Sequence, residues 1–464
     1  MNLVLAGLAI YLAAMLAVGA WVSRRIHSEG DYLIAGRSLG PALVAASVFA
    51  TWFGAETIIG ASGAIYTDGL AGGRADPFGY GLCLVGTAVI FAVPLWRRKL
   101  TTYADLFRER YSPGVERLMI AIYVPASLLW ASAQIRAFGQ VLGSVGGLDL
   151  EAAIGIAASL AVVYTLLGGL LADAITDLVQ GAALVVGLVL IWLAVLGEAG
   201  GFTASLAAVD PERFQPFASG GRSWLEVIEE WAIPVTGSML AVEILQRIIA
   251  ARSPGAAKWG TLGGAGLYVL VGLIPVYLGL AGPALLPGLA EPEQLVPSLA
   301  LQYLHPLAYV VFAGALVSIV LSTVDSALLA AGGLVSHNLV APALPSLGTR
   351  GRLVAARVSV AAFGLVATVL ALGAESIYDL VETASAFGST GVFVVSGFAL
   401  FTRTGGPASA YAALGVGLGV WAYGDYVAGW SIPYLTSMAC ALAAYVGVAA
   451  FERHGGAVPP SPVR

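Results

Sequence analysis

The segment "VSIVLSTVDSALLAAG" (residues 317–332) decides the fold, because it places polar groups in the middle of an apolar run. Five polar residues lie within nine positions of it: Ser318, Ser322, Thr323, Asp325 and Ser326. Ser322, Asp325 and Ser326 share nearly one helical face, and their oxygens are ligands that suit a hard monovalent cation. The alternative is that the hydroxyl groups bond to preceding carbonyls of the same helix, with Asp325 as a buried structural carboxylate.

The composition is that of an integral membrane protein. Of the 464 residues, 59% are hydrophobic and 11% are charged, with a mean hydropathy of +0.88. A soluble protein carries about 25% charged residues. Apolar runs of about 20 residues recur along the whole chain, as membrane-spanning helices require. We predict thirteen spans, at residues 3–22, 41–66, 77–96, 117–141, 150–169, 173–197, 228–248, 259–286, 306–336, 353–373, 376–401, 408–426 and 431–451.

Lysine and arginine residues are distributed unequally between the predicted loops. With the N-terminus outside, 18 of the 22 basic residues fall in cytoplasmic segments, among them Arg247, and only Arg74, Arg213 and Arg222 lie outside. Cytoplasmic loops of membrane proteins carry such an excess. The first apolar run lacks a basic start, so we expect a retained helix rather than a signal peptide. We therefore predict a multi-pass protein of the cell inner (plasma) membrane, with the N-terminus outside and the C-terminus cytoplasmic.

The longest connection, residues 197–230, divides the spans into two groups of five once the first helix is set aside. Such a division suits an inverted repeat, in which two halves of opposite topology enclose a site at mid-membrane. We therefore predict a single transmembrane domain over residues 1–464 with four parts: a peripheral first helix (3–22), a first repeat (41–197), a second repeat (228–401) and two C-terminal helices (408–451).

The second span, which contains "FATWFGAETIIGASG" (residues 49–63), has glycines that permit a break in the helix. Glu56 and Thr57 place polar groups beside Gly54, at mid-depth in the membrane. An unwound segment exposes backbone carbonyls, which can coordinate a cation where protein shields them from lipid. A glycine-rich packing face is the alternative, since glycine is common in membrane helices.

Ionisable residues within spans are rare and are therefore candidates for function. Six occur here: Glu56, Arg136, Asp177, Glu243, Asp325 and Glu382. The aromatic residues Trp52, Tyr80 and Trp130 form a second set, which could attract an organic cation or could simply be core and interface residues. No catalytic nucleophile, metal-ligand spacing, cofactor motif or nucleic-acid signature accompanies them. We therefore expect neither an enzyme nor an organic cofactor nor a nucleic-acid partner.

Four segments, in this order and spacing, resemble the sodium:solute symporter family. They are "LIAGRSLG" (33–40), "GGLLADAITDLVQG" (168–181), "EILQRIIAARS" (243–253) and "LSTVDSALLAA" (321–331). The second of them is similar to the Gly-Gly…Thr-Asp-x-x-Gln signature of that family. The resemblance runs from about residue 30 to residue 340. It implies an all-α, LeuT-like five-plus-five inverted repeat with one extra helix before it and two after it.

The resemblance also implies sites for one or two sodium ions. The main site would be formed by the carbonyls of Ala50, Phe53 and Ile319 and by the hydroxyls of Ser322 and Thr323. A second site, present in some members, would fall on Asp177, Ser322, Asp325 and Ser326. This chain has Asp at 325 where other members have Ser. The added charge either strengthens the second site or makes it partly proton-linked.

Within the family, several segments look most like the choline transporter branch. They are "ATWFG" (50–54), "DPFGYGLCL" (76–84), "LWASAQIRAFG" (129–139) and "ALQYLHP" (300–306). In that branch, tryptophans from several helices enclose a quaternary ammonium group, and Trp52 and Trp130 match two of them. The position of a third tryptophan of that branch is occupied here by Ala241. The resemblance therefore implies an incomplete cage and a polar or zwitterionic solute other than choline. The implied solute contacts are Trp52, Glu56, Thr57, Tyr80, Trp130 and Glu243.

Together, the residues and the resemblance predict a sodium-coupled secondary symporter that imports a small polar solute by alternating access. The solute would be an organic cation, an amino-acid-like molecule or another zwitterion. Two alternatives remain: proton coupling in place of sodium coupling, and a solute-sensing membrane domain that acts with a signalling partner.

Overall fold

The computed structural model describes residues 3–217, 221–374 and 376–454. Within these residues every regular element is a helix, apart from an isolated β-bridge between Leu39 and Ala251. Nine segments of the described chain are long and apolar enough to cross a membrane. The structure therefore confirms the predicted all-α membrane fold, whereas the total of thirteen spans remains a prediction.

Long helices form most of the molecule, and shorter helices connect or continue them. The long helices are α1 (Leu3–Ser23), α8 (Pro113–Gly146), α9 (Leu150–Glu198), α13 (Pro254–Leu285), α15 (Pro306–Val335), α17 (Thr349–Gly373), α20 (Pro407–Tyr426) and α21 (Pro433–His454). The shorter ones that precede α9 are α2 (Glu29–Ile34), η1 (Ala35–Arg37), α3 (Pro41–Trp52), η2 (Glu56–Gly60), α4 (Ala61–Asp68), η3 (Gly69–Gly73), η4 (Arg74–Gly79), α5 (Tyr80–Gly86), η5 (Thr87–Phe91), α6 (Ala92–Arg97) and α7 (Asp105–Arg110). Those that follow α9 are α10 (Phe202–Ala207), η6 (Pro211–Phe214), α11 (Trp224–Ala232), η7 (Ile233–Gly237), α12 (Val242–Ala250), η8 (Pro292–Gln294), α14 (Leu295–Tyr303), η9 (Ser336–Val340), α16 (Ala341–Ala343), α18 (Ile377–Ala386) and α19 (Ser389–Phe401).

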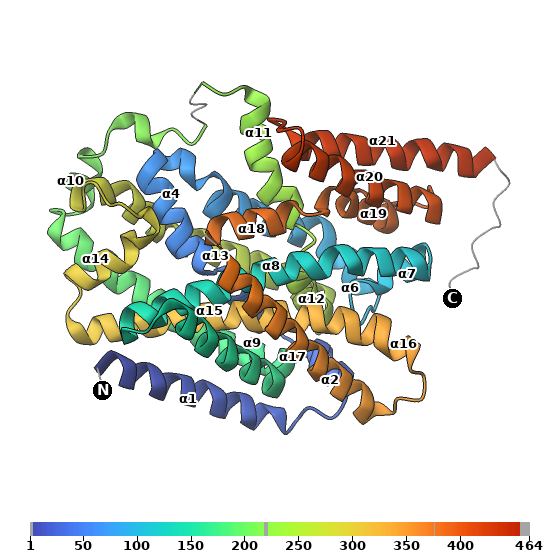
Figure 1. Cartoon of the computed structure of the whole chain (residues 1–464), viewed down its shortest axis with the longest axis horizontal. Coiled ribbons are helices and arrows are strands. Elements are labelled where there is room, and N and C mark those ends of the chain that lie inside the picture. Colours follow the sequence, from blue (N-terminus) through green and yellow to red (C-terminus); the bar gives the residue numbers. More distant parts are fainter. Residues whose placement is uncertain (1–2, 218–220, 375, 455–464) are drawn as a thin grey trace.

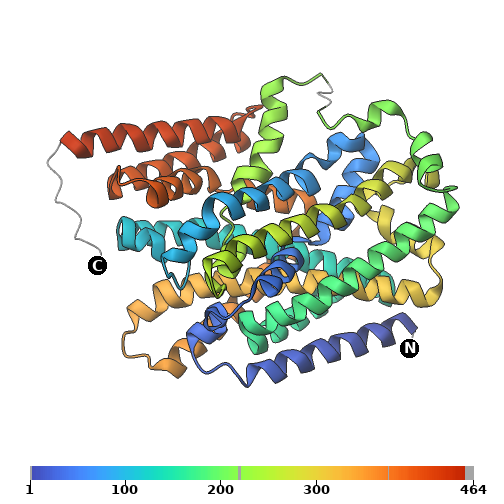
Figure 2. The same cartoon turned by 180° about the vertical axis from the view of Figure 1, so that it is seen from behind.

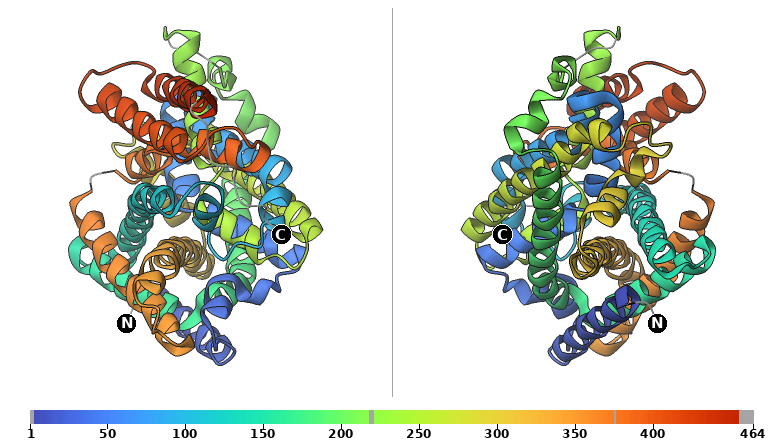
Figure 3. Two further views of the ribbon diagram at one scale, coloured as in Figure 1. Left: turned by 90° about the vertical axis from the view of Figure 1, so that its right-hand side faces the viewer. Right: turned by 90° about the vertical axis from the view of Figure 1, so that its left-hand side faces the viewer.

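Most long helices run along the longest axis of the molecule (Figure 1). The dark blue α1 lies at one edge, and the red α20 and α21 lie at the opposite edge, where they pack against each other and against α19. Seen along that axis, several of the long helices appear end-on (Figure 3). This arrangement places the two predicted C-terminal helices and the first helix outside the central group.

The central group is built around α15, which packs against α8 and α9. On the other side of the molecule, α3 packs against α13. Figure 2 shows this side, and α13 lies nearest to the viewer there. Gly260 and Gly264 of α13 lie so close to Val44 and Val48 of α3 that a Cβ atom would overlap with them. Small residues permit such close helix contacts in membrane proteins. The position of α3 beside α9 and α15 is thereby fixed.

The helix of the predicted second span breaks after Trp52, as one of the two interpretations of that segment expected. Phe53 leaves the helical region with φ −86° and ψ 79°. The Gly54 N–H then donates to the carbonyl of Trp52, at 3.1 Å, rather than to that of Ala50. The carboxylate of Glu56 folds back over Gly54, so a Cβ atom there would displace it.

A second break interrupts the predicted span 228–248, which we expected to be continuous. The chain leaves η7 at Gly237 and begins α12 at Val242. At Gly237 the backbone lies against the carbonyl of Ser385, so a Cβ atom there would overlap with that oxygen. The sequence did not indicate this break because only one glycine marks it, and the need for that glycine arises from a contact 148 residues further along the chain.

Two further interruptions lie within long apolar segments. The predicted spans 150–169 and 173–197 are joined in α9, and the helix is interrupted between them at Gly169, with φ 54°. The predicted span 376–401 is divided into α18 and α19 at Gly388, with φ 67°. Both interruptions use glycine because L-residues with side chains avoid positive φ.

Candidate functional site

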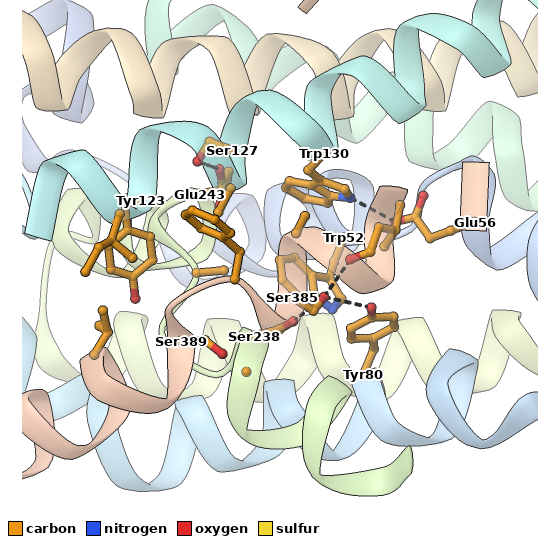
Figure 4. A pocket seen from close by; sticks show the side chains of 18 residues that line it. Trp52, Glu56, Tyr80, Tyr123, Ser127, Trp130, Ser238, Glu243, Ser385 and Ser389 are labelled. Atoms are coloured by element: carbon orange, nitrogen blue, oxygen red, sulfur yellow. Dashed lines mark hydrogen bonds between the residues drawn. The ribbon is translucent and has the colours of Figure 1, made fainter. Parts of the chain in front are cut away.

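A cavity of about 50 Å³ lies beside both helix breaks. Its walls come from the end of α3, from η2, α5 and α8, and from the segments around α12, α18 and α19. Figure 4 shows the side chains that face it. The polar and aromatic ones are Trp52, Glu56, Tyr80, Tyr123, Ser127, Trp130, Ser238, Glu243, Ser385 and Ser389. The cavity therefore gathers five of the six residues predicted to contact the solute.

The aromatic residues predicted from three separate segments lie together at this cavity. The ring centroids of Trp52 and Trp130 are 5.1 Å apart, and the ring of Tyr80 stands edge-on to Trp52 at 5.9 Å. Each of the three side chains is at most 7% exposed. The Nε1–H of Trp52 has no hydrogen-bond partner among the described residues. Aromatic faces grouped in this way favour a cationic ligand.

Two buried carboxylates face the same cavity. Glu56 accepts hydrogen bonds from the Nε2 of Gln134, at 2.6 Å, and from the Nε1 of Trp130, at 3.3 Å. Glu243 accepts one from the hydroxyl of Ser127, at 2.6 Å. All of these donors are neutral. Gln134 and Ser127 were not predicted, although both lie on α8 close to Trp130, at helical spacing from it.

Thr57 is the one predicted solute contact that the structure places elsewhere. Its hydroxyl donates to the carboxylate of Asp76, at 2.7 Å, and lies 3.1 Å from the hydroxyl of Tyr268. The helix break turns residue 57 away from the cavity and toward α13. Thr57 therefore does not line this cavity, because its side-chain direction is set by the backbone conformation at the break.

A wider hollow of about 240 Å³ adjoins the cavity and shares Glu56, Tyr80 and Val381 with it. Arg74, which lines this hollow, forms an ion pair with Glu230, and so does Arg222. Other acidic residues in its wall are Asp68, Asp76 and Glu382. Arg222 of the long connection between α9 and α11 also lines the hollow, so the hollow adjoins the cavity on that side of the molecule.

The oxygens of the predicted main sodium site lie where α15 meets the first helix break. The Thr323 hydroxyl is 3.2 Å from the carbonyl of Thr51 and 3.1 Å from that of Ile319. The Ala50 carbonyl is released from its helical bond because Gly54 N–H donates to Trp52. Carbonyl and hydroxyl oxygens gathered beside a broken helix are the ligands that sodium takes in such transporters. The residues present therefore suit the ion.

The Ser322 hydroxyl, the fifth predicted ligand of that site, donates to the carboxylate of Asp177. Asp177 also accepts a hydrogen bond from the hydroxyl of Ser47, at 2.5 Å. The predicted pair of Asp177 and Ser322 is thus in contact across α9 and α15, with α3 adjoining both.

The predicted second sodium site differs from its expected form because the guanidinium of Arg247 lies within it. Arg247 is completely buried and forms an ion pair with Asp173. It also donates to the hydroxyls of Ser326 and Ser47. Its position corrects the expectation that Arg247 is a cytoplasmic charge. A buried arginine needs such compensation, which Asp173 of α9 supplies.

Asp325 completes this group of charges. It is fully buried and lies beside Asp173 and Thr165, yet neither of its carboxylate oxygens has a hydrogen-bond partner among the described residues. Of the four residues predicted for the second site, Asp177 and Ser322 are therefore in contact, whereas Ser326 bonds to Arg247 and Asp173, and Asp325 lies beside Asp173. Asp173 and Arg247 both occur in the quoted motifs, at 168–181 and 243–253, but nothing in their spacing shows that they pair.

The sequence model of the sodium:solute symporter family matches residues 32–417 of this chain. The high-affinity choline transporter 1 of Drosophila melanogaster is 27% identical over 391 residues, which cover 80% of this chain and 62% of the fly protein. The match thus leaves more than a third of that relative's length outside it. The high-affinity proline transporter PutP of Bacillus subtilis is 28% identical over 381 residues, covering 77% of this chain and 78% of PutP.

Solved structures share the fold. A structure of a Na⁺-coupled sialic acid symporter, described as a substrate-bound outward-open state, superposes with a TM-score of 0.87 at 18% sequence identity. The superposition covers 97% of this chain and 98% of the symporter. It confirms the LeuT-like class of fold that the sequence motifs implied. From the family match over most of its length, we conclude that the chain belongs to the sodium:solute symporter family.

Proposed function

We propose that the chain is a sodium-coupled symporter that imports a small organic cation or a zwitterion with a cationic group. The observation that supports this function best is the cavity between the two helix breaks, where Trp52, Tyr80 and Trp130 lie with Glu56 and Glu243. A cationic group placed there gains from both the aromatic faces and the carboxylates. The relatives named for choline and for proline transport give two precedents for such a solute.

The coupling follows from the closeness of the solute cavity to the proposed sodium ligands. Trp52 lines the cavity, while the carbonyl of Thr51 beside it lies 3.2 Å from the Thr323 hydroxyl of α15. Sodium bound by Ser322, Thr323 and the carbonyls of Ala50, Phe53 and Ile319 would hold the broken segment in the shape that presents Trp52 to the solute. Each sodium ion entering across 100 mV contributes about 2.3 kcal/mol besides its concentration gradient.

Alternating access would follow from two inverted repeats, residues 41–197 and 228–401. The helix break in the first span of each half supports this division, because discontinuous helices at corresponding positions mark the site in such transporters. We place the protein in the cell inner (plasma) membrane, with the N-terminus outside and the C-terminus in the cytoplasm. The outer hollow then opens toward the outside, where the solute enters.

Uptake into proteoliposomes tests the proposed function. An inward sodium gradient should drive the accumulation of at least one member of a panel of organic cations, amino acids, sugars and carboxylates. A matched set of vesicles with a potassium gradient of the same size, and one with a proton gradient, serve as controls. Accumulation driven by protons alone would replace sodium coupling with proton coupling. Binding of a solute without flux under any gradient would favour a solute sensor.

A further inference from the structure

Neither of the two carboxylates of the cavity forms an ion pair with a residue that the structure describes. We propose that the transported solute carries two cationic nitrogen groups, joined by a short chain, one for Glu56 and one for Glu243. This inference rests on the proposed function and names the class of solute. It goes beyond the single quaternary ammonium of choline and the single amino group of proline.

The surroundings of the two carboxylates show that their charge is not balanced internally. Neither Glu56 nor Glu243 forms an ion pair with any residue that the structure describes, and no Lys, Arg or His lines the cavity. Both side chains are 3% exposed. Arg247 lies near Glu243, but its Nη1 donates to the backbone carbonyl of that residue and its Nη2 pairs with Asp173. A buried carboxylate without a cation is costly, so a cationic ligand would relieve both.

The positions of the carboxylates suit a solute with two charged ends. Glu56 begins the helix after the first break, and Glu243 lies in the first turn after the second break. In Figure 4, the rings of Trp52 and Trp130 lie between these two residues. A short alkyl chain could therefore cross the aromatic faces while its terminal nitrogens meet the carboxylates. A solute with one charge would leave one of the two glutamates without a partner.

One further group in the cavity has no partner. The Nε1–H of Trp52, which is 94% buried, finds no acceptor among the described residues. A buried donor without an acceptor is unfavourable, so a solute that also carries an acceptor would fit best. Two classes carry the two cationic nitrogens: simple diamines, which lack such an acceptor, and diamino acids, whose carboxylate could accept from Trp52. The experiment below separates them.

The outer hollow favours the same class of solute. Its wall carries the acidic residues Glu56, Asp68, Asp76, Glu230 and Glu382 but only two basic ones, Arg74 and Arg222. Both arginines pair with Glu230. A route lined with an excess of negative charge raises the local concentration of cations. A dication gains about twice as much from this field as a monocation does.

Binding to the purified full-length protein in sodium chloride tests the proposal. The probes are two matched pairs: pentane-1,5-diamine with pentylamine, and lysine with norleucine. Within each pair only the second amino group differs. Affinities are taken from the concentration dependence of the melting temperature. We expect at least one member with two amino groups to bind about tenfold more tightly than its partner or better, and tighter binding of lysine than of the diamine would assign an acceptor to Trp52.

Equal affinity within both pairs would overturn the proposal. If sodium-driven uptake of a solute with one charge were found at the same time, the symporter function would stand without it. If no solute bound and none was transported, the proposed function itself would fail.

Two variants sharpen the test. Glu56→Gln and Glu243→Gln should each reduce the preference for two amino groups to less than about twofold, because one carboxylate then remains. Glu151→Gln, which removes an exposed carboxylate that lines neither the cavity nor the outer hollow, is the matched control and should keep the preference. A preference that survives in both cavity variants would overturn the proposal. If neither variant folds, the comparison of the probe pairs on the unaltered protein still decides it.

Discussion

Two groups of buried carboxylates lie within this molecule, and they differ in what balances their charge. The group between α9, α12 and α15 holds Asp173, Asp177 and Asp325 around the guanidinium of Arg247. The group in the cavity, Glu56 and Glu243, has only neutral hydrogen-bond donors. The first group is stabilised largely from within the protein. The second depends on a cation that arrives from outside, which is what a transported solute can supply.

The largest effect should follow from removing the internal cation. Arg247→Gln leaves three buried aspartates without their guanidinium, and breaking a buried ion pair costs about 3–5 kcal/mol. We expect a large fall in the melting temperature of the purified protein, or loss of folded protein. Arg252→Gln, an exposed arginine five residues later, is the control and should melt like the wild type. If Arg247→Gln had normal stability, Arg247 would not compensate the charge of the three aspartates, and the two groups would not differ in this respect.

The proposed sodium ligands include Ser322, which contacts Asp177 of the first group, and removing their hydroxyls should abolish coupling. In the double variant Ser322→Ala with Thr323→Ala, we expect solute uptake that no longer increases with an inward sodium gradient. Ser318→Ala removes a hydroxyl one turn earlier on α15, where it contacts Tyr11 instead, and should keep the sodium stimulation. Unchanged sodium dependence of the double variant would exclude the proposed main site.

Within the first group, Asp173 and Asp325 should contribute differently to the free energy of unfolding. Asp173→Asn removes the partner of Arg247 and should lower the free energy of unfolding by about 3–5 kcal/mol. Asp325→Asn removes a carboxylate without a hydrogen-bond partner, so it should change this free energy by less than about 1 kcal/mol or stabilise the protein. Each aspartate serves as the control for the other in thermal unfolding. Equal losses would show that Asp325 also depends on Arg247.

The smallest effect concerns a residue that the structure separates from the cavity. Thr57→Val removes a hydrogen bond to Asp76 and a contact with Tyr268, at a cost of about 1 kcal/mol. We expect solute affinity to change by less than about twofold, because Thr57 does not line the cavity. Measuring affinity and melting temperature on the same preparation separates the two effects. A tenfold loss of affinity at normal stability would return Thr57 to the solute site.

The sequence was sufficient for the features that local pattern encodes. Glycine and polar residues at 54–60 marked the first break, and the hydroxyls of α15 marked the oxygens beside it. Trp52, Tyr80 and Trp130 could be grouped only through resemblance, because nothing in their spacing shows that three segments meet. Arg247 shows most clearly that local pattern does not encode contacts between helices. Its side chain pairs with Asp173, which is 74 residues away in the sequence. The count of basic residues assigned Arg247 to the cytoplasmic side. Pairing between residues on different helices produces no repeating pattern in the sequence that would have shown otherwise.

The second break escaped prediction for a related reason, and the contact that creates it has a mechanical consequence. Gly237 leaves no space between its backbone and the carbonyl of Ser385 on α18. Because the two segments are already in contact, they cannot move closer together. The break can shift toward α18 only if α18 shifts with it. Ser385 in turn bonds to Tyr80 and Ser238, at 2.9 and 3.0 Å. These contacts join the break to α5 and α18 in one wall of the cavity, and a side chain at 237 would force that wall apart.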